Sequence, residues 1–192
     1  MSPEFWTAFA SVGTLVVIAA TAVAAIIQLH HLRGSNQIIA LNEFREAFES
    51  PELLSARNAA FELTERMEDP AFRRSLERVQ TPDWFQRIQY AARLLETLGG
   101  YVKHGIVSEE IVCDLWSAPI VTLWTNIGPA IVVMRRTRGP ATYENFEMLA
   151  CLAQRFMSHH PSAYPKDLPR IAPPDKWEQE DARARAATGI AR

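Results

Sequence analysis

The chain has 192 residues, enough for one domain with an ordinary hydrophobic core once an apolar N-terminal run and a charged tail are set aside. A net charge of −2 and a pI near 6.2 give no overall basic field, so no nucleic-acid partner is predicted. A mean hydropathy of −0.09 is too low for a polytopic membrane protein and fits one span with a water-soluble domain.

An uncharged run over residues 5–29, FWTAFASVGTLVVIAATAVAAIIQL, follows a short N-terminus of residues 1–4. As a helix rising about 1.5 Å per residue it reaches ~37 Å, more than the ~30 Å hydrocarbon core of a bilayer. Its Ser and Thr hydroxyls can bond the preceding helical turn, and Phe5 and Trp6 suit the membrane interface. The run therefore predicts a transmembrane helix.

A cleaved signal peptide is the alternative, because small residues at 20–24 look like cleavage sites. The first four residues hold an acid and no Lys or Arg, and the apolar run continues to Leu29, so retention is favoured. Glu4 precedes the run, whereas two histidines and Arg33 follow it. The positive-inside rule then predicts a single-pass inner-membrane protein with its N-terminus outside and its C-terminal domain in the cytoplasm.

Small residues within the run, Gly13, Ala20 and Ala24, form a candidate seam for helix packing in the lipid bilayer. An Ala-rich span offers such spacing by chance, so self-association through the seam is left open. The seam also supports an alternative function, an oligomerising membrane effector of toxin or defence type.

Residues 30–49 predict an amphipathic juxtamembrane helix that continues from the span, with a candidate hinge at Gly34-Ser35. Its apolar side is expected in the core and carries Ile38, Leu41, Phe44 and Phe48.

Residues 50–159 show apolar stripes at helical spacing without strand alternation, and predict an all-α bundle. Helix starts are expected at three sites where a capping residue precedes a proline: Ser50-Pro51, Asp69-Pro70 and Thr81-Pro82. The residues expected in the core are Leu53, Ala56, Ala60, Leu63, Met67, Phe85, Ile88, Ala92, Leu95, Val102, Ile111, Val112, Leu115, Phe146, Leu149, Ala153 and Phe156.

Glycines indicate where one further helix ends, and a serine indicates where the next one begins. The third of these helices is expected to end or break at Gly99-Gly100 or Gly105, and Ser108 to cap a short helix behind it.

A second uncharged stretch, Leu115 to Met134, is also long enough to cross a bilayer. Pro119 and Pro129 interrupt it, with Asn126 and Gly128 between them, and lipid cannot replace the backbone hydrogen bonds that they remove. The stretch is therefore predicted to be the central helix of the bundle, with a second span as the alternative.

Three arginines, Arg135, Arg136 and Arg138, follow this stretch. They suit the C-terminus of a helix, and contact with anionic lipid headgroups is the second interpretation. A last helix is expected from about Thr142. Residues 160–192 are rich in proline and charge, and predict a tail that is disordered or wrapped along the surface.

No motif for catalysis, a metal or a cofactor is found. The pairs His30-His31 and His159-His160 are adjacent, so in a helix their rings diverge by about 100° and cannot share one ion. Cys113 and Cys151 are expected to pack as small hydrophobic residues. Trp116 and Trp124 lie eight residues apart and are expected either to wall a pocket or to pack in the core. An enzyme or small-ligand sensor using such a pocket is kept as an alternative.

Three blocks together carry a resemblance: LRGSNQIIALNEFREAFESPEL behind the span, DLWSAPIVTLW, and YENFEMLA. With an Ala/Val-rich span before them, they resemble a family of small bacterial membrane proteins known as a domain of unknown function, from about Phe5 to Met157. The resemblance implies one span and a helical cytoplasmic domain, and no activity or site residue. We expect an interaction or assembly module at the cytoplasmic face of the membrane, which binds a protein partner or itself.

Overall fold

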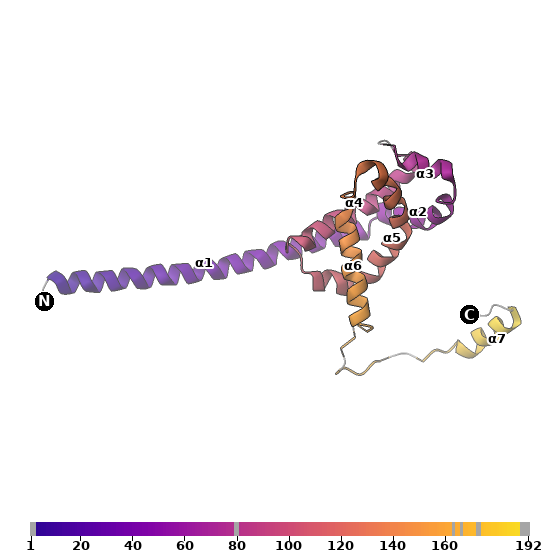
Figure 1. Cartoon of the computed structure of the whole chain (residues 1–192). Helices are drawn as coiled ribbons and strands as arrows, with labels where there is room; N and C mark the ends of the chain where they lie inside the picture. Colours follow the sequence, from indigo (N-terminus) through magenta and orange to yellow (C-terminus); the bar gives the residue numbers. More distant parts are fainter. Residues whose placement is uncertain (1–2, 79–80, 163, 166, 172–173, 189–192) are drawn as a thin grey trace. The chain divides into compact units, whose positions relative to one another are not determined.

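The computed structural model describes residues 3–78, 81–162, 164–165, 167–171 and 174–188. Throughout these ranges the regular structure is helical and no strand occurs, which confirms the predicted all-α fold (Figure 1). The chain forms two units, residues 1–161 and residues 162–192.

Helix α1, Pro3–Phe48, is one unbroken helix of 46 residues. It confirms that the helix over residues 30–49 continues from the apolar run, and it passes through Gly34 and Ser35 without interruption. Phe44 and Phe48 at its end are buried as expected. Ile38 is 61% exposed, so its predicted place in the core is wrong, because the bundle packs only against the last turns of α1.

Helices α2, Pro51–Arg66, and α3, Pro70–Leu76, begin where the cap-and-proline pairs predict. The Ser50 hydroxyl accepts a hydrogen bond from the Leu53 amide at 3.2 Å, and the Asp69 carboxylate accepts one from the Ala71 amide at 2.8 Å.

Helix α4, Asp83–Lys103, begins one residue later than Thr81-Pro82 predicts, with Pro82 at the cap position. Thr81 does not cap it. Its buried hydroxyl donates to the Gln89 side chain at 3.0 Å instead. Of the two ends expected for this helix, the one at Gly99-Gly100 is wrong, because the helix runs through both glycines. The one at Gly105 is confirmed, since the helix ends at Lys103 and Gly105 has a φ of +66°.

Helix α5, Glu109–Arg138, has 30 residues and contains both Pro119 and Pro129. The prediction of a short helix behind Ser108 is therefore wrong, and Ser108 forms no side-chain cap bond. Pro129 removes the usual partner of the Thr125 carbonyl, but both residues are exposed, so water can hydrate that carbonyl. The helix continues because its other side is held by tertiary packing.

The bundle core gathers around α5, which packs against α2, α3, α4 and the last bundle helix, α6, Glu144–His159. Most residues of the predicted stripes are buried, with Met67, Val102 and Phe156 partly buried at the margin of the core. Ile111 and Leu115 are exceptions and lie exposed on α5. Each fully buried Leu, Ile or Phe contributes about 1.5–3 kcal/mol, so these stripes supply most of the driving force for the bundle.

Within residues 162–192 the structure contains helix α7, Glu178–Thr188, which the sequence analysis did not predict. Three acids lie in its first turn and Arg185 in its last, an arrangement that complements the helix dipole.

Candidate functional site

The N-terminal half of α1 is an apolar surface without a partner helix among the described residues. The candidate span lies within Ala10–Phe48, and no residue of its most apolar window is buried within the chain. The Thr14 hydroxyl donates to the Ala10 carbonyl at 2.9 Å, and the Thr21 hydroxyl donates to the Val17 carbonyl at 2.8 Å. These bonds satisfy the two hydroxyls inside the helix, so the surface needs no water to hydrate them.

The candidate packing seam lies on this exposed surface. Ala20 and Ala24 line a shallow apolar strip with Val16, Ala19, Val23 and Ile27. A methyl group added at Gly13 would meet no other part of the chain. The seam is accessible to a second helix, and self-association through it stays a prediction.

Trp116 fixes the end of α1 to the bundle. Its ring centroid lies 5.0 Å from that of Phe44 in an edge-to-face arrangement and 6.1 Å from that of Phe48. The two phenylalanine rings lie 5.5 Å apart. This aromatic cluster joins α1 directly to α5, the central helix of the bundle.

Trp124 has different neighbours. Its ring meets Phe146 of α6 at 5.1 Å and an interplanar angle of 84°, and Gly128 on the next turn leaves room for it. The two tryptophans therefore contact different helices, and neither lines the hollows described below. A pocket walled by both rings stays a prediction.

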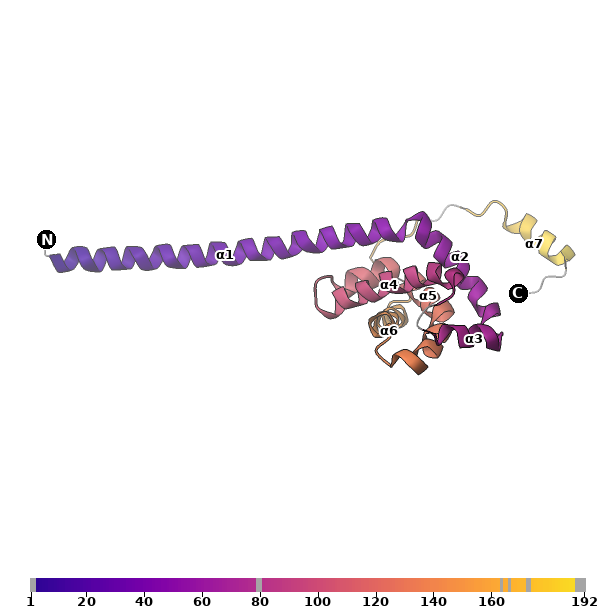
Figure 2. The ribbon, with the colours of Figure 1, turned by 90° about the horizontal axis from the view of Figure 1, so that it is seen from above.

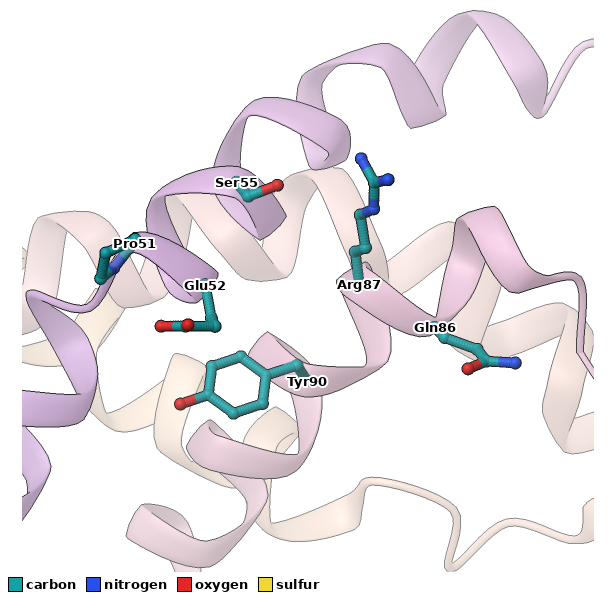
Figure 3. Close-up of a pocket in the computed structure, with 6 residues that line it drawn as sticks. All are labelled: Pro51, Glu52, Ser55, Gln86, Arg87 and Tyr90. Carbon is teal, nitrogen blue, oxygen red and sulfur yellow. The ribbon is translucent and has the colours of Figure 1, made fainter.

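A hollow of about 520 Å³ lies between α2 and α4 (Figure 3). Pro51, Glu52 and Ser55 line it from α2, and Gln86, Arg87 and Tyr90 from α4. Within the described part of the chain neither Glu52 nor Arg87 forms an ion pair, so the hollow offers one free carboxylate and one free guanidinium. Sequence analysis missed it, because these residues lie on the solvent-facing sides of two helices and only the tertiary fold brings them together.

A second hollow of about 330 Å³ lies between the end of α1, α2 and α5. Arg57 and Phe61 contribute from α2, Pro119 and Asn126 from α5, and Phe61 is 59% exposed. A large exposed aromatic residue beside a hollow is a feature of surfaces that bind other proteins.

The three arginines at the end of α5 connect it to the rest of the bundle. Arg135 pairs with Glu147 at 2.6 Å, and Arg136 pairs with Glu77 at 3.1 Å. Arg138 donates to the Leu76 carbonyl at 3.3 Å. Contact of these arginines with lipid headgroups stays a prediction.

A polar network that the sequence analysis missed holds the N-terminus of α6. Its cap position, Tyr143, has a left-handed φ of +56° and forms no side-chain cap bond. The Glu96 carboxylate of α4 caps the helix instead, accepting from the Asn145 side chain and the Phe146 amide, each at 2.8 Å. Burial raises the pKa of the Tyr143 phenol, although Arg93 and Arg138 act in the opposite sense.

The two cysteines lie in different environments. Cys113 is fully buried, as expected, and burial together with Glu109 raises the pKa of its thiol to about 11. Cys151 is exposed, so the expectation that it packs as a small hydrophobic residue is wrong. Its position on α6 faces away from the neighbouring helices.

The histidine pair at the end of α6 contacts backbone rather than a shared ion. The Nδ1 atoms of His159 and His160 lie 2.7 Å and 3.1 Å from the carbonyl oxygens of Arg155 and Phe156. The side chain of His30 lies outside the described residues. In the ranges that the structure covers, no group of three or more His, Cys, Asp or Glu side chains is placed to hold a metal ion.

Comparisons with known proteins place the chain in one family. No curated protein and no solved structure matches it. A family described as a domain of unknown function, DUF4760, matches residues 15–153, which begin inside the apolar run of α1 and end in α6. Since this match covers more than half of the sequence, the chain belongs to the DUF4760 family.

Proposed function

We propose that the protein is a single-pass, membrane-anchored interaction module, with α1 crossing the membrane and the bundle lying at its cytoplasmic face. The observation that carries the proposal is the contrast along α1. Its most apolar window has no buried residue, whereas Phe44 and Phe48 at its end belong to the bundle core. A helix that presents such a surface needs an apolar environment outside the chain.

Two observations favour a retained span over a cleaved signal peptide. The family match begins at Leu15, so removal at residues 20–24 would cut within the family domain. The same helix then continues without a break into the aromatic cluster around Trp116. One continuous helix thus links the proposed anchor to the bundle, which suits a module held at the membrane.

Two surface features support a role in binding. The α2–α4 hollow offers the unpaired charges of Glu52 and Arg87, and the hollow beside α5 offers the exposed ring of Phe61. Aromatic anchors and free arginines are enriched among residues that dominate protein interfaces. The inferred partner is a protein, or a second copy of the chain, that reaches the bundle at the membrane surface.

The test uses the native cysteines in the full-length protein, expressed in bacterial cells and treated with a membrane-impermeant maleimide. Cys151 is exposed, so its labelling shows on which side of the membrane the bundle lies. Cys113 is buried, so its labelling shows whether the bundle is folded. We expect the protein to stay in the carbonate-washed membrane fraction. Cys151 should label only in opened cells, and Cys113 only after denaturation.

Three results would contradict the proposal. Labelling of Cys151 in intact cells would mean that the orientation is reversed or that α5 is a second span. Release by carbonate would remove the anchor. Labelling of Cys113 in opened cells without denaturation would mean that the bundle does not bury it.

A further inference from the structure

The direction of α4 relative to α1 follows from two hollows. In one, Ala40 and Phe44 of α1 face Leu94, Leu98 and Tyr101 of α4. In the other, Pro51 to Ser55 of α2 face residues 86–90 of α4. Later residues of the α1–α2 segment therefore face earlier residues of α4, so the two run in opposite directions. The C-terminus of α4 points back along α1 toward its apolar half.

The turn between α4 and α5, residues 104–108, is consequently the part of the bundle that reaches furthest toward the apolar half of α1. Figures 1 and 2 both show the end of α4 on the side from which α1 approaches, and the α2–α3 turn on the opposite side. The amides of Ile106 and Val107 both donate to the Tyr101 carbonyl, at 2.9 and 3.3 Å, which ties the turn to α4.

Helix geometry sets the height of this turn above the apolar run. Ala40 follows Leu29 by eleven residues, about 16 Å at ~1.5 Å per residue. The turn and the Ile106 side chain extend back from the Ala40 level by roughly 8 Å, about one helical turn plus one side chain. The Ile106 side chain therefore lies about 8 Å beyond the level of Leu29, and the headgroup layer on each side of a bilayer is ~5–7 Å thick. A tilt of about 20°, usual for spans, would lower a group about 10 Å from the axis by ~3–4 Å if α1 leans toward the side of the turn.

Apolar residues that the core does not use lie at this level. Ile106 is 47% exposed although its neighbour Val107 is buried. Ile38 and Ile39 of α1, between the apolar run and the bundle, are also exposed. Exposed aliphatic side chains therefore occur on both elements between the bundle core and the end of the apolar run.

The charges around the turn are largely neutralised within the bundle. Lys103 pairs with Glu144 at 3.6 Å, and Glu109 pairs with Arg155 at 2.9 Å. His104 and Glu110 remain exposed on either side of Ile106. A contact here is therefore apolar rather than driven by anionic lipid. One isoleucine is too little to bind a free protein to lipid, but α1 already holds the bundle at the surface, which makes the contact intramolecular.

We propose that the α4–α5 turn rests in the headgroup layer of the membrane that α1 crosses, with Ile106 in contact with lipid. The inference depends on the proposed function, since α1 must span. Its partner is the lipid surface itself, and the bundle thereby presents its α2–α3 end, on the far side, to the cytoplasm.

The test places a bimane fluorophore at single sites of the full-length protein in phosphatidylcholine vesicles, in a Cys151→Ser background. Cys113 is retained because it is buried. The three sites are Val17→Cys in the apolar run, Ile106→Cys in the turn and Glu68→Cys in the α2–α3 turn. All three are exposed, so the label itself disturbs no core contact. Separate vesicles carry a nitroxide quencher on the acyl chain or on the headgroup.

We expect the acyl nitroxide to quench the label at residue 17. The headgroup nitroxide should quench residue 106 at least about twice as strongly as residue 68, because the layer is only ~5–7 Å thick. Equal quenching at 106 and 68, with 17 quenched by the acyl nitroxide, would overturn the inference and leave the proposed function standing. No acyl quenching at 17 would overturn the proposed function itself.

Discussion

Helices α1 and α5 both contain uncharged stretches long enough to cross a bilayer, yet they have opposite surroundings. None of the most apolar window of α1 is buried within the chain, against 44% of that of α5. The reason lies in the neighbours: α5 meets the apolar stripes of α2, α4 and α6, whereas residues 10–29 of α1 meet no matching stripe in the described structure. Length and hydropathy define a candidate span. Whether such a helix is buried in a bundle core depends on whether neighbouring helices offer apolar faces that pack against it.

The largest test of this difference compares a truncation in each helix. Ile131 of α5 is fully buried, so Ile131→Ala should lower the free energy of unfolding of the bundle by about 2–5 kcal/mol. Val17 of α1 is exposed, and Val17→Ala should change it by less than ~0.5 kcal/mol. Urea unfolding of the full-length protein in detergent, followed by tryptophan fluorescence, measures both. Equal effects would show that α5 is not the core.

Glycines sharpen the comparison at smaller magnitude. A methyl group at Gly99 would overlap the Asn145 carbonyl of α6, so Gly99→Ala should destabilise the bundle by about 1–3 kcal/mol. Gly100→Ala on the same helix and Gly13→Ala on α1 meet no neighbouring atoms. Gly100→Ala should be neutral or stabilising by up to ~1 kcal/mol. Thermal unfolding monitored by circular dichroism separates the three, and a harmless Gly99→Ala would contradict the close α4–α6 contact.

A further effect is confined to alkaline pH and reports the burial of α5 at Cys113. The pKa of the folded thiol is raised to about 11 from 9.0. Between these values the unfolded chain releases a proton that the folded chain retains, so stability should fall as pH rises through this window. Urea midpoints from pH 8 upward should fall more steeply for the wild type than for Cys113→Ala. Cys151→Ala should behave as the wild type, and parallel slopes for all three would mean that Cys113 is accessible to solvent.

Local signals in the sequence predicted much of the fold. The capping residues Ser50 and Asp69 and the stripe from Leu53 to Leu63 are written within a few residues of each other, so helix starts and buried faces could be predicted. The central bundle helix over residues 115–134 was predicted despite Pro119 and Pro129. Its start at Glu109 was not, because the residues behind Ser108 were assigned to a separate short helix.

The site features that were missed depend on long-range contacts. Glu96 caps a helix that begins 48 residues later, and Gly99 is required by the backbone of that same helix. The α2–α4 hollow likewise combines the exposed sides of two separate helices. None of these has a periodic or motif signature in a single sequence, whereas the aromatic contact of Trp116 with α1 was at least marked by residue type.

Helix α1 runs unbroken from the apolar run to Phe44. The number of residues between these two parts therefore sets both the rotation of the bundle around the α1 axis and its distance along that axis. In an α-helix each residue adds about 100° of rotation and ~1.5 Å of rise. One residue inserted between Leu29 and Ile38 would therefore swing the bundle through more than a quarter circle around α1 while lifting it only slightly. The direction in which the bundle faces, relative to the apolar half of α1, is thus set by the number of residues between them.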